Sequence, residues 1–563
     1  MFSLKINTAI QGSEDFDILI IGGGILGLAI AREAAERGHS VGLIEKNDFY
    51  CATSASTSKL IHGGLRYLEN FEFDLVRESL KERRILMLSA SHLVKPLSFL
   101  IPVLPWTKPN PFFLFLGLKT YDLLSFDRNR YLPEESYIPN SKFLGKSEID
   151  QILPELRELT KGGFLYYDAL NIHPERLALA FLKSAHEKGA KFYNHVEIEN
   201  FLVEKNHHLS QLRGVEVKDT LTGKTATFKA KVFVNATGPW ADLLLSRIFG
   251  QPVKILKRST GIHFLTKPIW NVKSAVLLRT KSKRHFFIIP WLDFSLIGPT
   301  DTPFDGDPDD LQPTKEEIET FIQEINQTFE KKMITKEQIQ DVIIGIRPLL
   351  YSQNQTYLAT RKHQVFSHKK DGWKGLFSVV GGKWTTARKI GEDVLQEIYM
   401  EFPEFQRTSK NVDTSILPLF GSPGYSNPFS VYEDFALKEF KIKEINSEQH
   451  KYLISLYGTE HIEILKLIHE NPKLAKPIDD SFPNRELYAQ VQFAFEYEGA
   501  RTLEDIVRRR IGYGTYGVPD KNVLTNIAEF VGKSLKWTKT RVKKEVENTL
   551  SSYPTEVLKQ VKA

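Results

Sequence analysis

A short stretch near the N-terminus, "STSKLIHGGLRYLEN" at 56–70, contains side chains that can handle a proton and an anion. Histidine is the residue type whose ordinary pKa lies near neutrality, so His62 is a candidate proton acceptor. Arg66, four positions later, has a planar guanidinium that can bind two oxygens of an anion at once. Gly63 and Gly64, between them, allow backbone to lie close to a bound group. A single histidine is more often structural than catalytic. A catalytic role for His62 therefore needs support from the elements that surround it in the sequence.

The composition is that of an ordinary globular protein, with 41% hydrophobic and 26% charged residues among 563. This length exceeds one compact core and predicts two or three domains. The net charge of +6 comes from basic residues scattered among nearly as many acids, which favours no nucleic-acid partner but would allow a mild attraction to anionic lipid. The single cysteine, Cys51, excludes an intrachain disulfide and a cysteine-rich metal site. We expect a reducing, cytoplasmic setting and no metal.

No segment has the features of a signal peptide or a membrane span. Residues 1–16 lack a continuous apolar core, and the most apolar later stretch, 111–126, is interrupted by Lys119 and Asp122. That stretch falls short of the roughly 18 uninterrupted apolar residues of a spanning helix. We interpret it as a packed amphipathic helix, with an interfacial helix as the alternative.

The residues before this region follow the pattern of a dinucleotide-binding unit. Residues 16–21, "FDILII", are predicted to form a buried parallel strand. Gly22, Gly24 and Gly27 then satisfy the G-x-G-x-x-G spacing. In such a motif the first glycine allows a tight turn, the second lets backbone approach a pyrophosphate, and the third lets a helix pack on the strand.

A helix over about 25–37 and a second strand within 39–46 are expected to follow the glycines. Glu45 ends this strand, where a carboxylate can accept hydrogen bonds from a ribose. The order of strand, glycine turn, helix, strand and acid predicts dinucleotide binding. The alternative is a glycine-rich turn in an unrelated α/β unit.

Two later stretches favour FAD over NAD. "AKVFVNATGPWA" at 230–241 is predicted to be a buried strand ending near Ala236 and Gly238, where a second backbone segment can approach the nucleotide. "GLFSVVGGKWTTARKIGEDV" at 375–394 is predicted to be a strand, a glycine pair and a helix. The positive N-terminal end of that helix suits the carbonyl end of an isoalloxazine ring, which becomes anionic on reduction.

With these motifs the chain resembles the FAD-dependent (aerobic type) glycerol-3-phosphate dehydrogenases, within the D-amino-acid-oxidase-like flavoproteins. The resemblance runs from "DILIIGGGILGLAIAREAAERGHSVGLIEKNDFYCATSASTSKLIHGGLRYLE" through "FVNATGPWAD", "FFIIPW", "IGPTDTPFDGDP", "GIRPLL" and "GGKWTTARKI". Near the C-terminus, "EYEGARTLEDIVRRRIGYG" is similar to the family's helical cap motif. Gly261-Ile262-His263 departs from the Gly-Ser-His that the family often has.

The resemblance and the pattern of elements together imply an α/β fold, α+β overall, in three parts. A Rossmann-like FAD-binding domain is expected to be discontinuous, an antiparallel-sheet substrate-binding domain to be inserted in it, and a helical cap to follow. The expected ranges are 1–75, 150–255 and 340–410 for the FAD-binding domain, 76–149 and 256–339 for the substrate-binding domain, and 415–563 for the cap.

The activity implied by the resemblance is oxidation of sn-glycerol 3-phosphate to dihydroxyacetone phosphate, a step of glycerol metabolism. The hydride on C2 would pass to N5 of non-covalently bound FAD, and the electrons to membrane quinone. The resemblance also implies peripheral attachment to the anionic inner face of the cytoplasmic membrane, and a homodimer is possible. The alternatives are an oxidase of the same substrate that uses O₂, an amine or amino-acid oxidase, and a flavin-binding scaffold without activity.

Four residues are expected to be catalytic. His62 is the first choice as general base and His263 the second. The charge of Lys383, at a predicted helix start, would stabilise negative charge on the reduced flavin or the substrate oxygen. By resemblance, Arg347 lies with Lys383 at the reacting end of the substrate.

The remaining site residues bind substrate or cofactor. By resemblance, Arg66 and Arg361 bind the phosphate, with Tyr67 beside them, and Arg347 and Lys383 also contact the substrate. The residues expected to bind FAD are Gly22, Gly24, Gly27, Glu45, Thr53, Ser54, Ser58, Lys59, Gly63, Gly64, Ala236, Gly238, Gly382 and Thr385.

Overall fold

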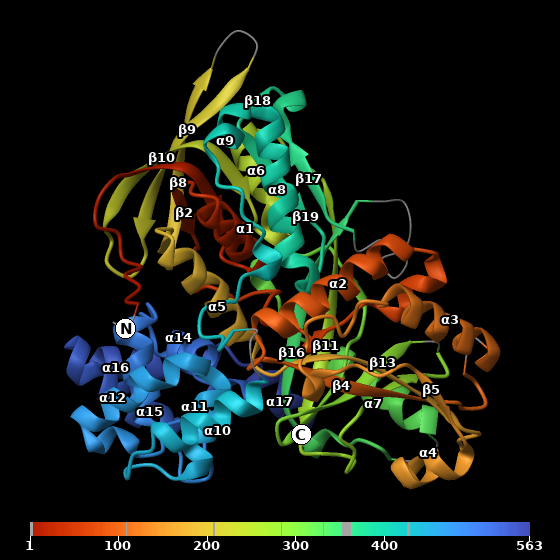
Figure 1. Ribbon diagram of the computed structural model, residues 1–563. Coiled ribbons are helices and arrows are strands. Elements are labelled where there is room, and N and C mark those ends of the chain that lie inside the picture. Colours follow the sequence, from red (N-terminus) through yellow and green to blue (C-terminus); the bar gives the residue numbers. More distant parts are fainter. Residues whose placement is uncertain are drawn as a thin grey trace.

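The structure is a computed structural model, shown in Figure 1. It describes residues 4–107, 110–205, 209–282, 284–329, 332–351, 362–424 and 428–562. Two sheets and a C-terminal group of helices make up the molecule, so the predicted fold class is confirmed. No helix of the described residues is both long and apolar enough to cross a membrane.

The first sheet is built around a parallel core. β1 (Glu14–Ile21) lies between β2 (Val41–Ile44) and β10 (Thr225–Asn235), with β7 (Lys191–Tyr193) and β19 (Leu376–Val380) outside them. β17 (Gln364–Ser367) closes one edge, and β8 (Val196–Lys205), β9 (Ser210–Asp219) and β18 (Trp373–Lys374) extend from β10.

Both faces of β1 are buried, which explains its continuous apolar sequence. Ile18 and Ile20 belong to the core shared with α1 (Ile25–Glu36), α5 (Pro174–Glu187) and α8 (Ala387–Glu401). Leu19 and Ile21 belong to the core on the other side, with α6 (Ala241–Phe249).

The second sheet is antiparallel except for one parallel pair, β4 with β12. Its order is β15 (Thr302–Phe304), β11 (Leu256–Thr266), β14 (Phe294–Gly298), β13 (His285–Trp291), β12 (Ala275–Arg279), β4 (Val94–Pro102), β6 (Gly163–Asn171) and β3 (Leu60–Ile61), with β16 (Ile339–Leu350) on β11 and β5 (Lys142–Leu144) on β6. β3, β6 and β16 come from ranges expected in the FAD-binding domain, but each pairs with a strand of this sheet. The domain boundaries themselves stay a prediction.

Helices cover both faces of the second sheet. α7 (Lys315–Phe329) and α4 (Lys146–Ile152) pack on one face. α2 (Phe73–Ser89), α3 (Pro111–Leu124) and part of the C-terminal group share the core on the other face. α3 begins where the side chain of Asn110 accepts a hydrogen bond from Phe112 N, with Pro111 in the first turn.

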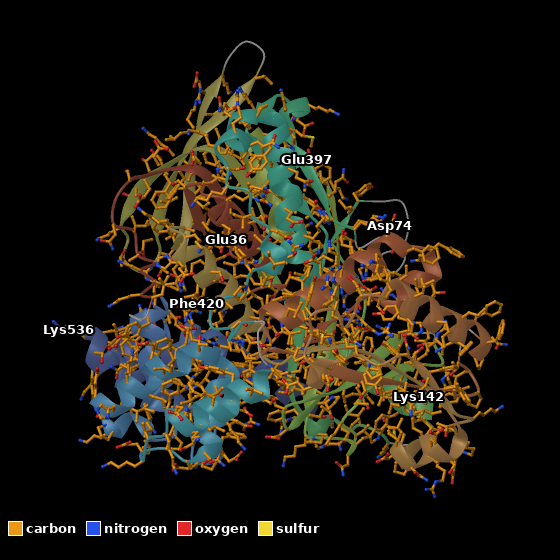
Figure 2. The ribbon with its side chains drawn as sticks, viewed as in Figure 1. Glu36, Asp74, Lys142, Glu397, Phe420 and Lys536 are labelled. Carbon is orange, nitrogen blue, oxygen red and sulfur yellow. The ribbon has the colours of Figure 1, made fainter. Side chains whose placement is uncertain are left out.

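The outer face of α3 is apolar, which differs from the amphipathic helix expected. Leu114, Leu118 and Tyr121 are buried, but Phe112 and Phe113 are each 63% exposed. Figure 2 shows the side chains of the molecule, with Asp74 and Lys142 on the right and Lys536 on the left.

Most of the C-terminal helices lie at the lower left of Figure 1, coloured cyan to blue. They are α10 (Phe429–Glu439), α11 (Ser447–Tyr457), α12 (His461–Glu470), α13 (Tyr488–Tyr497), α15 (Lys521–Leu535), α16 (Lys539–Ser551) and α17 (Thr555–Lys562), with the short α14 (Leu503–Asp505) and the π-helical turn η13 (Ile506–Arg510). Leu558 and Val561 of α17 pack into the core under α7. Buried ion pairs join this group to α5, which packs on the first sheet, among them Arg176 with Glu498 at 2.7 Å.

Candidate active site

The glycine loop after β1 is packed too closely to admit side chains. Gly22 has φ +110°, and a Cβ on it would lie 2.6 Å from the carbonyl oxygen of Ala236. A Cβ on Gly27 would lie 2.0 Å from the carbonyl oxygen of Gly22. The end of β1, the start of α1 and the segment after β10 therefore meet, as the sequence predicts.

Glu45, at the end of β2, lies against this loop. One of its carboxylate oxygens accepts a hydrogen bond from Gly23 N at 2.7 Å and the other from Asn47 N at 2.9 Å. Burial raises the pKa of Glu45. A carboxylate with two such bonds still has lone pairs for a ribose hydroxyl, so its place fits the predicted role.

The hydroxyls after the glycine loop are tied to the two sheets. Ser54 Oγ accepts from Ile25 N at 2.9 Å at the start of α1, next to Gly24, whose Cβ would lie 3.2 Å away. Thr53 Oγ1 donates to the carbonyl of Ile346 on β16 at 2.7 Å. These contacts hold the segment between the glycine loop and the second sheet.

Lys59 is turned into the protein interior. Its φ is +57°, its Nζ lies 3.0 Å from a carboxylate oxygen of Glu175 and its side chain is 2% exposed. The ammonium also lies 4.9 Å from the centre of the Trp291 ring. Its positive charge is thus already neutralised by Glu175, and a contact with FAD stays a prediction.

The histidine segment and the "GGKWTT" segment meet through two hydrogen bonds. His62 N donates to Thr385 Oγ1 at 3.2 Å, and Lys383 Nζ donates to the carbonyl oxygen of Gly63 at 3.3 Å. Lys383 precedes the 3₁₀ turn η9 (Trp384–Thr386), which leads into α8. The structure therefore brings together two motifs that lie more than three hundred residues apart in sequence.

The two glycine pairs make this approach possible. Gly64 has φ +81°, and a Cβ there would lie 2.1 Å from the Tyr67 ring. Gly382 has φ +79°, and a Cβ there would lie 2.6 Å from Ile390. Gly238, after β10, also has a positive φ, of +57°.

His62 is kept neutral by its surroundings. Its pKa is lowered to about 3, first by burial and then by the positive charges of Lys383 and Arg66. Arg66 lies on the 3₁₀ turn η1 (Leu65–Asn70), with its guanidinium 5.9 Å from the centre of the Tyr67 ring. A bound anion would offset these charges and raise the basicity of His62.

His263, on β11, has a different environment. Its Nε2 shares a hydrogen bond of 2.8 Å with Ser58 Oγ, and its Nδ1 is buried with no hydrogen-bond partner among the described residues. Burial and the charge of Arg347 lower its pKa to about 3. Both candidate bases are thus neutral imidazoles that could accept a proton.

Arg347, on β16, is fixed by the neighbouring backbone. Its guanidinium donates to the carbonyl oxygens of Thr260 at 2.8 Å and Thr300 at 2.9 Å, and to Asp301 at 3.2 Å. Gly261 on β11 makes room for it, because a Cβ there would lie 2.2 Å from the guanidinium. Arg361 lies outside the described residues.

Sequence reasoning missed Asp168, which bonds to the histidine segment. Its carboxylate accepts from Gly63 N at 3.3 Å and is 1% exposed. An acid within the apolar strand "GFLYYDALN" is the signal that could have indicated it, since a buried carboxylate needs a partner.

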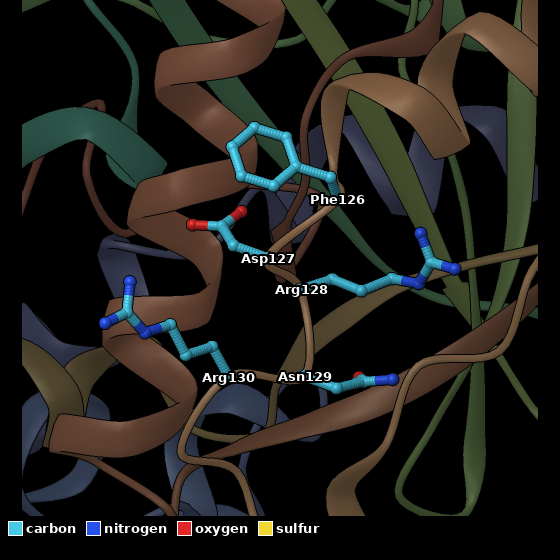
Figure 3. A pocket seen from close by; sticks show the side chains of 5 residues that line it. All are labelled: Phe126, Asp127, Arg128, Asn129 and Arg130. Carbon is cyan, nitrogen blue, oxygen red and sulfur yellow. The ribbon is translucent and has the colours of Figure 1, made fainter.

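A separate surface pocket of about 500 Å³ follows α3 and is lined by none of the predicted site residues. In Figure 3, Arg128 and Arg130 point to opposite sides of its chain segment. Arg128 Nε donates to the carbonyl of Ile138 at 2.9 Å, so this arginine already has a structural role.

Comparison with known proteins places the chain in a family. The model of the FAD-dependent oxidoreductases matches residues 17–394, and that of the C-terminal domain of alpha-glycerophosphate oxidase matches 412–542. The glycerol-3-phosphate dehydrogenase of Synechocystis is 34% identical over 94% of this chain and 95% of its own length. The aerobic glycerol-3-phosphate dehydrogenase of Staphylococcus aureus is 30% identical over 90% and 88%.

Among solved structures, the glycerol-3-phosphate dehydrogenase of Bacillus halodurans complexed with FAD superimposes with a TM-score of 0.74 at 25% identity. The superposition covers 96% of this chain and 95% of that one. The chain therefore belongs to the FAD-dependent oxidoreductases and, among them, to the glycerol-3-phosphate dehydrogenase family.

Proposed function

We propose that the protein oxidises sn-glycerol 3-phosphate to dihydroxyacetone phosphate with non-covalently bound FAD. The observation that carries this proposal is the contact of Lys383 with the Gly63 carbonyl, because it brings a cation to the residue next to the candidate base His62. The names of the Synechocystis and Staphylococcus aureus relatives support the same activity.

The residues around the glycine loop fit FAD. Gly22 and Gly27 allow the tight turn and the close packing of α1, a Cβ on Gly24 would meet only Ser54, and Glu45 offers carboxylate oxygens beside this loop. The bound structure from Bacillus halodurans supports the same cofactor. When bound, FAD supplies the acceptor for the hydride that leaves C2 of the substrate.

The chain's own residues supply the proton acceptor and the charges. His62 accepts the proton of the C2 hydroxyl, since its imidazole is neutral before substrate binds. Lys383 stabilises the negative charge that develops on the substrate oxygen. Arg66 and Arg361 bind the phosphate, Tyr67 lies against Lys383 at 4.5 Å, and Arg347 acts at the reacting end.

We further propose that the electrons pass to quinone in the cytoplasmic membrane, to whose inner face the protein attaches peripherally. The exposed aromatic face of α3 supports this attachment, because Phe112, Phe113 and Leu123 offer apolar surface without the length to span a bilayer. Arg130, in the segment that follows α3, is exposed, and its charge favours anionic lipid.

Anaerobic stopped-flow spectroscopy tests the proposal. Glycerol 3-phosphate should bleach the flavin of the purified protein, and a soluble quinone should then restore its colour faster than O₂ does. Fast reoxidation of the flavin by O₂ would instead support the alternative function, an oxidase of the same substrate. A flavin that stays oxidised with glycerol 3-phosphate would contradict the substrate, and light scattering of the same sample would test the possible homodimer.

A further inference from the structure

Gly63 is held through both of its backbone groups. Its N–H donates to Asp168 Oδ1 at 3.3 Å, and its carbonyl oxygen accepts from Lys383 Nζ at 3.3 Å. Asp168 lies on β6 of the second sheet, whereas Lys383 lies at the start of the segment leading into α8. Gly63 therefore connects a buried carboxylate to the cation of the proposed site.

Asp168 is itself fixed by two further donors. Tyr121 on α3 donates its hydroxyl to the carboxylate at 2.7 Å, and Arg83 on α2 forms an ion pair with it. Asp168 and Arg83 are each 1% exposed and Tyr121 is 3% exposed. A carboxylate buried in this way has no freedom to move unless the helices move with it.

The sequence of the loop fits this arrangement. A Cβ on Gly63 would lie 2.4 Å from the hydroxyl of Tyr121 and 2.6 Å from a methyl carbon of Leu80. Gly63 is thus needed for the close approach of Tyr121, in addition to any approach of backbone to the cofactor. Gly63 and Tyr121 therefore pack directly against each other.

We propose that Asp168, supported by Arg83 and Tyr121, is a positioning residue for the reductive step. It fixes the Gly63 carbonyl, which holds Lys383, and the bond from His62 N to Thr385 then sets the base relative to that cation. The proposal rests on the proposed function, because it concerns the rate at which substrate reduces the flavin. Asp168 has no contact with the reacting atoms in this role.

Two substitutions and a matched control separate positioning from folding. Asp168→Asn keeps the shape of the side chain but weakens it as an acceptor, and Tyr121→Phe removes one donor while leaving the pair of Asp168 with Arg83 intact. Tyr166→Phe is the control, because its ring lies 6.1 Å from that of Tyr121 and stacks on Phe99. All three change a buried polar group of the same region.

The readout is the limiting rate of anaerobic flavin reduction per bound FAD, together with the glycerol 3-phosphate concentration that gives half of it. A displaced base and cation should lower the limiting rate of Asp168→Asn about 10- to 100-fold. The half-saturating concentration should change less than about threefold, since the phosphate contacts remain. Tyr121→Phe should be slower than Tyr166→Phe, whose rate should match the unmodified protein.

A limiting rate of Asp168→Asn equal to that of the unmodified protein overturns the positioning role. If Asp168→Asn does not fold or bind FAD, Tyr121→Phe decides: a slower rate than in Tyr166→Phe supports the role, and equal rates overturn it. Failure of glycerol 3-phosphate to bleach the unmodified protein contradicts the proposed function itself. Bleaching of the unmodified protein with unchanged variants contradicts the positioning role alone.

Discussion

The ammonium group of Lys383 lies 4.5 Å from the centre of the Tyr67 ring, in the segment that also contains His62. The same ammonium donates to the carbonyl of Gly63 at 3.3 Å. A positive charge fixed in this way needs little reorganisation when negative charge develops on a substrate oxygen. Its contribution should therefore be to the rate of flavin reduction more than to FAD binding.

Lys383→Met should lower the limiting rate of flavin reduction about 100- to 1,000-fold, as loss of one fixed donor does in other active sites. The FAD content per protein should stay within about twofold, because the glycine loop and Glu45 are untouched. Lys389→Met is a suitable control, since that lysine pairs with Asp393 on α8. Equal losses of rate and of FAD in Lys383→Met would contradict the role.

The pH dependence of flavin reduction should show the effect that the charge of Lys383 has on the pKa of His62. The pKa of His62 is lowered to about 3 by burial and then by Lys383, so removal of this cation raises that pKa toward the ordinary value. The low-pH limb of kcat/KM for flavin reduction should therefore move to higher pH in Lys383→Met. Ionisation of the substrate phosphate is common to both proteins, so a limb at the same pH in both would argue against His62 as the base.

The two histidines can be separated by substitution. His62→Asn should slow flavin reduction about 100- to 10,000-fold through loss of the general base. His263→Asn should have a smaller effect, because the Nε2 of His263 is bonded to Ser58 in the absence of substrate. Loss of the reductive step in His263→Asn alone would transfer the role of base to His263.

The sequence predicted the elements of the nucleotide unit because they are local. The apolar run of β1, the glycine spacing and the acid after β2 lie within 32 residues, from Glu14 to Glu45, and each has a geometric reason at its own position. The contact of Lys383 with Gly63 is not local, and the resemblance implied only that Lys383 and His62 serve the same site.

Other features depended on tertiary packing that the sequence does not encode in short patterns. Glu175, the partner of Lys59, lies on α5 and left no signal near "STSKL". The sequences of β6 and β16 would suit a strand of either sheet. Only their pairing with β4 and β11 shows that they belong to the second sheet. The apolar outer face of α3 resembles a core face in sequence, because hydrophobic spacing does not tell which face is covered.

The phosphate should be needed for tight binding. Lys383 and Arg66 both lower the pKa of His62, which indicates a cluster of positive charge at the site. A substrate without phosphate leaves such cations unpaired, at a cost of roughly 3–5 kcal/mol if they are buried by the substrate. Glycerol should therefore need a concentration about a hundred- to a few-thousand-fold higher than glycerol 3-phosphate for half-maximal bleaching. Similar concentrations would contradict the phosphate site.

The face of α3 should bind lipid. The double variant Phe112→Ser, Phe113→Ser removes two side chains that are each 63% exposed, so it should weaken partitioning to anionic vesicles about tenfold or more. Val431→Ser with Leu535→Ser is the control, because these side chains are exposed on C-terminal helices. Co-sedimentation with vesicles measures both. Equal partitioning of the two double variants would exclude α3 as the attachment surface.

A buried ion pair should contribute to the attachment of the C-terminal helices to the loop after β2. The guanidinium of Arg510 binds both carboxylate oxygens of Asp48, at 2.6 and 2.9 Å, and both side chains are 1% exposed. Its Nε also donates to the carbonyl of Glu498. Because the pair is desolvated, loss of one partner leaves an uncompensated charge in the interior.

Asp48→Asn should therefore lower the free energy of unfolding by about 3–5 kcal/mol. Glu556→Gln is the control, because its pair with Lys559 is exposed and should contribute no more than about 1 kcal/mol. Urea unfolding followed by tryptophan fluorescence and by flavin release measures the difference. If the Asp48 variant unfolds at the same urea concentration as the control, the pair does not hold the two parts together, and other contacts such as that of Arg176 with Glu498 must do so.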